Sequence, residues 1–199
     1  MSTADALSFR CTGCGNCCRD LHVAVTSGDV ARLVAATGRP ATDLVSFLAP
    51  DAVDMSGEPD SFVELREGRR LMVLRRENGA CHLLDGDQRC SVYDARPLDC
   101  AAFPFEVEAG PSHPSADAPK VRRLELLQPE RCEAAFDAHN DVRAISATDS
   151  LRDAELRVYR SEVAHFNRQV ARRRRFGHRL PDAQAFVEFL LASRPSVTP

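Results

Sequence analysis

Apolar residues recur at intervals of three or four between residues 141 and 174, which predicts one long amphipathic helix. Pro181 and Asp182 then provide the start signal for a last helix. The apolar stripe of the long helix consists of Leu151, Ala154, Leu156, Tyr159, Val163, Phe166 and Val170. The last helix places Phe186, Phe189, Leu190 and Leu191 on its apolar side.

The first third of the chain predicts short elements of both kinds. Residues 21–25 have the composition of a strand, and Thr26 or Ser27 can cap a helix that Gly38 ends. After Pro40, Thr42 or Asp43 can cap a second short helix. Its apolar residues would be Leu44, Val45, Phe47 and Leu48.

The middle of the chain is dominated by turns between short apolar runs. Residues 62–65 and 71–74 flank Glu67-Gly68 as a hairpin, and Asn78-Gly79 turns into a further strand at 80–84. The following segments are expected to be a turn at 85–87, a helical turn over 91–96 stopped by Pro97, extended structure at 103–107, a loop at 109–119 and a strand at 121–127.

These elements predict an α+β fold, in which a cysteine-rich core of short antiparallel strands is flanked by helices. We expect residues 1–140 to form a cysteine-cluster, metal-chelating domain. Residues 141–199 are expected to form a C-terminal helical extension packed on it.

Composition excludes several classes of protein. The chain has 199 residues, of which 44% are hydrophobic, so a core of ordinary size can form without cysteine crosslinks. The net charge of -3 makes nucleic acid an unlikely partner, and the basic run 172–175 is interpreted as a solvated helix end. No apolar stretch is long enough for a membrane span, and the first eleven residues lack signal-peptide features. We therefore expect no membrane partner and a cytoplasmic location.

Four of the eight cysteines fall within eight residues, in the order C-x2-C-x2-C-C. Thiolates bind soft and borderline metals, and a two-residue gap lets two sulfurs converge on one centre. Gly13, Gly15 and Asn16 fill the gaps and permit left-handed turns. The motif therefore predicts a metal site. Its cysteines are Cys11, Cys14, Cys17 and Cys18.

The motif needs sulfurs from elsewhere, because adjacent side chains such as those of Cys17 and Cys18 point well apart. If the motif is helical, Cys11, Cys14 and Cys18 share a face and Cys17 leans aside. Eight thiols then allow either two four-sulfur sites or one four-sulfur site with spare thiols. The remote candidates are Cys81, Cys90, Cys100 and Cys132. Four disulfides would also suit the even count, but the adjacent cysteine pair and the expected reducing compartment disfavour them.

Two metals compete for this set of thiols. Zinc usually takes two short C-x2-C pairs, and the second pair is missing because the later cysteines are 9 and 10 residues apart. An iron–sulfur cluster is larger and accepts looser spacing, which favours a 4Fe–4S cluster over zinc. The chain is not a ferredoxin, because Cys18 follows at once and the Cys-Pro continuation is absent.

The motifs CTGCGNCC and CSVYDARPLDCAAFPF resemble the YkgJ-type cysteine-cluster family, described as zinc- or iron-chelating domains. The resemblance covers residues 9 to about 105 and implies metal chelation by the motif cysteines. A larger relative, the flagellin lysine methylase, has a similar cysteine motif. No S-adenosylmethionine loop is recognisable here, so that activity is not carried over and enzyme function stays open.

Polar residues beside the cysteines have weaker signals. Arg96 either offsets the negative charge of a thiolate centre or lies on the surface, and Tyr93 is expected to pack in the core. His22 and His82 are expected to be structural or solvent-facing. No catalytic triad, phosphate loop or acid–base pair is recognisable.

The sequence thus predicts a protein that holds iron as an iron–sulfur cluster, with a redox, sensing or modification-linked role. The alternatives are a structural zinc-binding module that contacts a protein partner, and a metal-dependent modification enzyme related to the flagellin lysine methylases.

Overall fold

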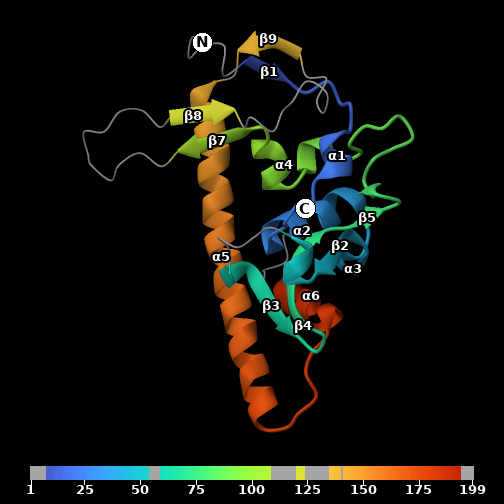
Figure 1. Ribbon diagram of the computed structural model, residues 1–199, viewed down its shortest axis with the longest axis vertical. Helices are drawn as coiled ribbons and strands as arrows, with labels where there is room; N and C mark the ends of the chain where they lie inside the picture. The colour runs from blue at the N-terminus through green and yellow to red at the C-terminus, as the bar shows by residue number, and fades with distance from the viewer. Residues whose placement is uncertain (1–7, 54–58, 109–119, 124–134, 140, 194–199) are drawn as a thin grey trace, which may run out of the picture.

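The computed structural model describes residues 8–53, 59–108, 120–123, 135–139 and 141–193. It confirms the α+β class, with helices and short antiparallel strands. The long helix α5 (Val142–Arg175) runs along the long axis of the molecule, and the other elements lie beside it (Figure 1).

The predicted C-terminal helices are confirmed. The side chain of Asp141 caps α5 by accepting from the amide of Arg143, and α6 (Ala183–Ala192) is capped in the same way by Asp182. The predicted stripe of α5 is buried from Tyr159 onward, whereas Leu151 is exposed, so the upper end of the helix covers less core than the pattern indicated.

A three-stranded antiparallel sheet in the order β2-β4-β3 packs beside α5 and α6. The predicted hairpin is confirmed as β3 (Phe62–Leu65) and β4 (Gly68–Leu74). The prediction of a second short helix is wrong for residues 45–48. Only α3 (Ala41–Leu44) is helical, and β2 (Val45–Leu48) pairs with β4. Sheet pairing overrides the helical pattern here, because β4 offers an open edge to this segment.

The helix α2 (Ser27–Thr37) begins and ends as predicted. Thr26 and Asp29 form a reciprocal capping box, and Gly38 adopts a left-handed conformation at the C-terminal end. The predicted strand at 21–25 is reduced to a single bridge between Ala24 and Val73.

Smaller elements surround the cysteines. Phe105–Glu108 confirms the extended segment after Cys100, and the predicted strand at 121–127 is present over 120–123. The expected loop at 109–119, residues 124–127 and Cys132 lie outside the described residues. The remaining elements are β1 (Ser8–Arg10), α1 (Cys17–Asp20), η2 (Pro50–Ala52), η3 (Pro59–Ser61), β5 (Arg76–Glu77), β6 (Ala80–Cys81), η4 (Tyr93–Ala95), α4 (Leu98–Ala102), β7 (Phe105–Glu108), β8 (Lys120–Arg123) and β9 (Ala135–His139). The strands of the described residues form four sheets, namely β1 with β9, β5 with β6, β7 with β8, and the central sheet.

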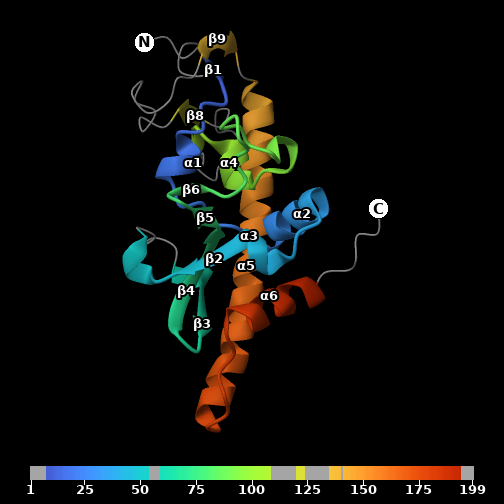
Figure 2. The same cartoon turned by 90° about the vertical axis from the view of Figure 1, so that its right-hand side faces the viewer.

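One hydrophobic cluster joins the sheet, α2, α5 and α6. Phe186 of α6 is fully buried and makes edge contacts with the rings of Tyr159 and Phe166. Figures 1 and 2 show this sheet and α6 beside the lower part of α5, whereas α1 and α4 lie beside its upper part. The division into two domains at residue 140 stays a prediction.

Candidate metal centre

A cavity of about 990 Å³ lies between the N-terminal cysteine motif, the turn region after β6, and α4. Every described cysteine lines it, and none of them forms a disulfide. These residues are Cys11, Cys14, Cys17, Cys18, Cys81, Cys90 and Cys100. The structure therefore brings together segments up to 89 positions apart in the sequence (11 to 100), while Cys132 lies outside the described residues.

Two glycines set the path of the motif. Gly13 and Gly15 have φ angles of +74° and +71°, as expected for left-handed turns, whereas Asn16 is right-handed. Gly15 also lies against the turn that precedes Cys90, because a Cβ added to it would be 2.8 Å from the carbonyl oxygen of Gln88. Only glycine allows this close approach of the motif to the turn.

The helical arrangement of the motif, in which Cys17 would lean aside, does not form. Residues 11–15 are not helical, and the only helical residues of the motif are those of α1, so the predicted shared face does not exist. A negative charge on Cys17 would help to raise the pKa values of Cys81, Cys90 and Cys100. Cys17 lines the same cavity as the remote cysteines, as do the other three cysteines of the motif.

The remote cysteines lie on short, hydrogen-bonded turns. Cys81 ends β6, whose hairpin turns through Asn78 and Gly79 with positive φ, as predicted. Cys90 forms an antiparallel bridge with Leu84, after a turn in which the carboxylate of Asp85 accepts from the amides of residues 87 and 89. These contacts confirm that Cys81 and Cys90 flank a tight excursion.

Arginines join the motif to these turns. Arg76 donates to the backbone carbonyls of Leu21, at 2.5 Å, and of Arg19. Arg19 in turn donates to the side chain of Gln88. Because the partners of Arg76 are carbonyls, its positive charge remains available to the cavity, where it partly opposes the burial that raises the pKa of Cys81.

The thiols themselves are shifted toward the neutral form. A hydrogen bond with Cys18, then burial, raises the pKa of Cys17. Burial, followed by the charges of the neighbouring thiolates, raises the pKa of Cys100. Burial is also the largest cause that raises the pKa values of Cys81 and Cys90. A bound cation would reverse this repulsion, so metal binding must release protons.

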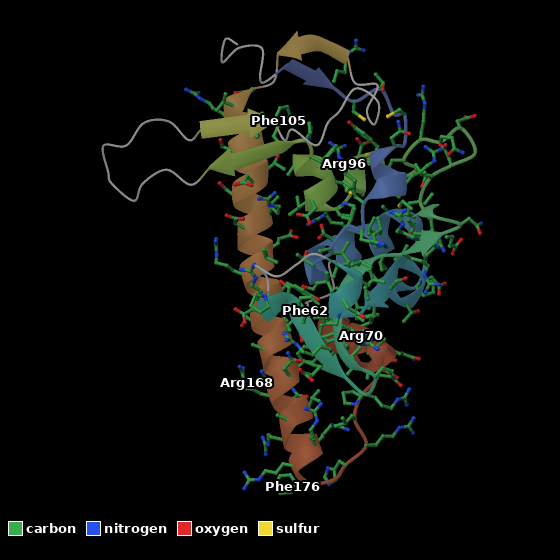
Figure 3. The ribbon with its side chains drawn as sticks, viewed as in Figure 1. Phe62, Arg70, Arg96, Phe105, Arg168 and Phe176 are labelled. Carbon is green, nitrogen blue, oxygen red and sulfur yellow. The ribbon has the colours of Figure 1, made fainter. Side chains whose placement is uncertain are left out.

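Arg96 lies on the wall of the cavity and partly opposes the burial that raises the pKa of Cys90, which supports the predicted role of offsetting thiolate charge. Its guanidinium stacks on the ring of Tyr93, 3.9 Å from the centroid, and donates to the Tyr93 carbonyl at 2.9 Å. Tyr93 is 47% exposed, so the expectation of core packing is wrong. Its ring holds the arginine instead. Figure 3 shows Arg96 beside α4.

Sequence reasoning missed the residue that anchors α4. Asp29 is 2% exposed and accepts a hydrogen bond of 2.9 Å from the amide of Leu98, two residues before Cys100. Arg32 binds Asp29 and also Glu155 of α5, each at 2.5 Å. The capping box was readable in the sequence, but the bond to Leu98 spans 69 positions and has no local signal.

Asp99 is the acidic residue nearest to Cys100 in sequence and lines the cavity. Its side chain opens onto the cavity, yet the surrounding protein removes enough solvent to raise its pKa to about 6, with Arg152 opposing the shift. The histidines are peripheral. His22 is exposed at the cavity wall, and burial lowers the pKa of His82, which is not part of that wall.

The donors share a cavity without converging on one point. Within the described residues, no three His, Cys, Asp or Glu side chains are placed to hold a single metal ion. The donor set is nevertheless rich in sulfur and edged by arginine, which suits a soft, negatively charged thiolate centre.

The family model described as "Putative zinc- or iron-chelating domain", CxxCxxCC, matches residues 10–133. The chain belongs to this family. Membership supports metal chelation and agrees with the resemblance expected from the two motifs. Comparisons with curated proteins and with solved structures each found no match. Among the helices of the described residues, none is sufficiently long and apolar to cross a bilayer.

Proposed function

We propose that this protein holds iron as an iron–sulfur cluster of the 4Fe–4S type. The observation that carries the proposal is the cavity of about 990 Å³ lined by seven thiols from three separate segments. As ligands we assign one thiol of the motif together with the three remote thiols that line the same cavity. They are Cys17, Cys81, Cys90 and Cys100.

The spacing of the donors favours a cluster over a single zinc ion. Tetrahedral zinc with bonds of about 2.3 Å brings its four sulfurs to about 3.8 Å from one another. No three donors in the described ranges approach a common ion in that way. A cluster places its iron and sulfide between the thiolates and so accepts ligands that are farther apart.

The remaining motif cysteines line the same cavity and are available for a second site. Cys11, Cys14 and Cys18 would need one more ligand, and Cys132 is the predicted candidate. Whether there are one or two centres stays a prediction, as does the role of Cys132.

The protein's own residues would tune the centre. Four thiolates around a 4Fe–4S core leave a charge of about -2, which the guanidinium groups of Arg76 and Arg96 offset. Asp29 holds α4, and therefore Cys100, in place. When bound, the cluster would supply one-electron chemistry, which fits a redox or sensing role in a reducing compartment such as the cytoplasm.

Anaerobic purification with elemental analysis tests this proposal. We expect a brown protein with iron and acid-labile sulfide in equal amounts. Cys100→Ser should lose most of both, whereas Ala101→Ser, on the same helix, should keep them. A colourless protein with stoichiometric zinc would instead support the structural zinc module. Methyl transfer from S-adenosylmethionine would support the modification enzyme.

A further inference from the structure

The C-terminal end of α5 carries a concentration of positive charge that contrasts with the net charge of -3 of the chain. Residues 168–179 contain no acidic residue. We call the six arginines of this segment the basic pole. They are Arg168, Arg172, Arg173, Arg174, Arg175 and Arg179.

The basic pole is exposed yet held in a fixed shape. Every residue from 171 to 179 is exposed. The backbone turns back at Gly177, whose φ is +67°, and its amide donates to the carbonyl of Arg174 at 3.2 Å. The amide of His178 donates to the carbonyl of Arg173 at 2.9 Å. The arginines are therefore presented by an ordered helix end.

Few carboxylates face this charge. Within the described residues, the structure shows one ion pair for the pole, between Arg174 and Glu64 of β3 at 3.3 Å. Asp182 caps α6, and Glu188 accepts from Gln184. Complementing the helix dipole requires one or two cations in the last turn, whereas four successive arginines repel one another. Helix stability alone does not account for the run.

An aromatic ring lies at the centre of the pole. Phe176 is 65% exposed, and its ring is 5.9 Å from the guanidinium carbon of Arg175. Figure 3 shows it at the lower extremity of the molecule, beyond Arg168. The C-terminal end of α5 therefore presents an exposed apolar ring that is surrounded by arginines.

A cleft of about 490 Å³ between α5 and α6 adjoins the pole. Its lining includes Arg173 and Arg179, together with the apolar side chains of Phe166, Val170 and Phe189. Asp182 and Glu188 also line it, the first engaged in the cap of α6 and the second with Gln184. Cationic and apolar groups side by side match an amphiphile whose phosphate adjoins hydrocarbon.

We propose that the basic pole docks end-on onto a membrane surface that contains anionic lipid. Polybasic clusters of four to eight residues bind such surfaces, and one apolar anchor supplies the second signal needed for stable binding. A nucleic-acid strand fits less well, because stacking proteins present several aromatic rings along a groove and this tip has one exposed phenyl ring. Surface docking needs no membrane-spanning helix, and it would hold the cysteine cavity, beside the opposite end of α5, away from the lipid (Figure 1).

Vesicle co-sedimentation of the full-length protein tests this proposal. The wild type should bind vesicles of phosphatidylglycerol mixed into phosphatidylcholine, and should not bind phosphatidylcholine alone. Each neutralised arginine should weaken binding roughly fivefold, so Arg172→Gln/Arg175→Gln should weaken it roughly 25-fold. Phe176→Ser should also weaken binding. High salt should release the protein from the anionic vesicles.

Arg143→Gln/Arg157→Gln is the matched control, because it removes two exposed arginines of the same helix outside the pole. It should bind within twofold of the wild type. Melting curves and metal content establish that all variants are folded and loaded. Equal binding to anionic and neutral vesicles, or equal loss in the pole and control variants, overturns the proposal. Binding of a single-stranded oligothymidine without vesicle binding overturns it in favour of a nucleic-acid surface.

Discussion

Different interactions stabilise the two ends of the molecule. Around the lower part of α5, the sheet and α6 bury a continuous apolar cluster that includes Phe186 and Met72. We call this part the core half. Around the upper part, residues 8–23 and 76–102 surround a cavity, and their cysteines are exposed or half-buried. We call this part the cysteine half. There, Leu83 and Val92 extend the same cluster, and turns, arginine–carbonyl bonds and the Asp29 contact supply much of the remaining support.

We expect the core half to be stabilised mainly by its own packing, whereas the cysteine half should depend more strongly on its metal. Burial of apolar area supplies the main favourable free energy of a core. Thiolate coordination can supply free energy of comparable size where a core is lacking. Five predictions test this division, beginning with the largest effect.

Metal removal should separate the two halves most strongly. Loss of the centre should remove stabilisation on the order of 10 kcal/mol from the cysteine half. Amides of residues 80–102 should then exchange at least roughly 100-fold faster with deuterium, while those of β4 change little. Mass spectrometry of loaded and chelator-treated protein measures this. Uniform loss of protection across both halves would show that they are not separable.

Phe186→Ala should act on the core half. Phe186 is fully buried against Tyr159 and Phe166, so truncation should lower the free energy of unfolding by about 3–5 kcal/mol. Thermal or denaturant melting measures the change. Phe176→Ala, which truncates an exposed ring, is the control and should cost less than about 0.5 kcal/mol.

Asp29→Ala should affect the link between the halves. It leaves the amide of Leu98 without a buried partner and leaves Arg32 paired with Glu155 alone, at a cost of about 2–3 kcal/mol. Metal affinity should fall in parallel, because α4 carries Cys100. Asp29→Asn can still accept a hydrogen bond from the amide of Leu98. It should therefore lose less unfolding free energy in denaturant titrations and less metal affinity in competition titrations. Equal losses in the two variants would contradict this assignment.

Gly15→Ala should move the cysteine motif away from the turn before Cys90. The new Cβ would meet the Gln88 carbonyl at 2.8 Å in addition to the strain of a positive φ. Gly13→Ala has similar strain but no backbone contact closer than 4 Å, so it should cost only about 1–2 kcal/mol. Metal competition titrations should show a larger loss for Gly15→Ala. A larger loss for Gly13→Ala would refute the close approach.

Asp99 should give the smallest effect, visible in the pH dependence of the metal-free protein. Its pKa is raised from 3.8 to about 6, so the folded state binds more protons than the unfolded state between these values. The contribution of this group to stability is full below about pH 4 and is lost as the pH rises through about 6. Asp99→Asn should flatten that part of the stability curve. An unchanged slope would show that Asp99 titrates normally.

The sequence predicted those elements whose signals are local. The caps at Thr26 and Asp182 and the turn at Asn78-Gly79 depend on neighbouring residues, and all three were found where expected. The family resemblance likewise depends on two contiguous motifs.

Predictions that depend on distant contacts were less successful. Val45 and its neighbours have a helical pattern but become a strand because β4 lies beside them. The helical turn in which Cys17 would lean aside does not form, because the segment before α1 is not helical. The bond from Asp29 to Leu98 has no sequence signature, since either residue alone looks ordinary.

Thiol-labelling kinetics test most directly whether the motif and the remote segments bind one shared centre. Loaded and metal-free protein would be alkylated, and the modification of each cysteine followed by mass spectrometry. We predict that Cys17, Cys81, Cys90 and Cys100 are protected together in the loaded protein and become reactive together when the metal leaves. Protection confined to the N-terminal motif, or disulfides between the two groups, would contradict a shared centre.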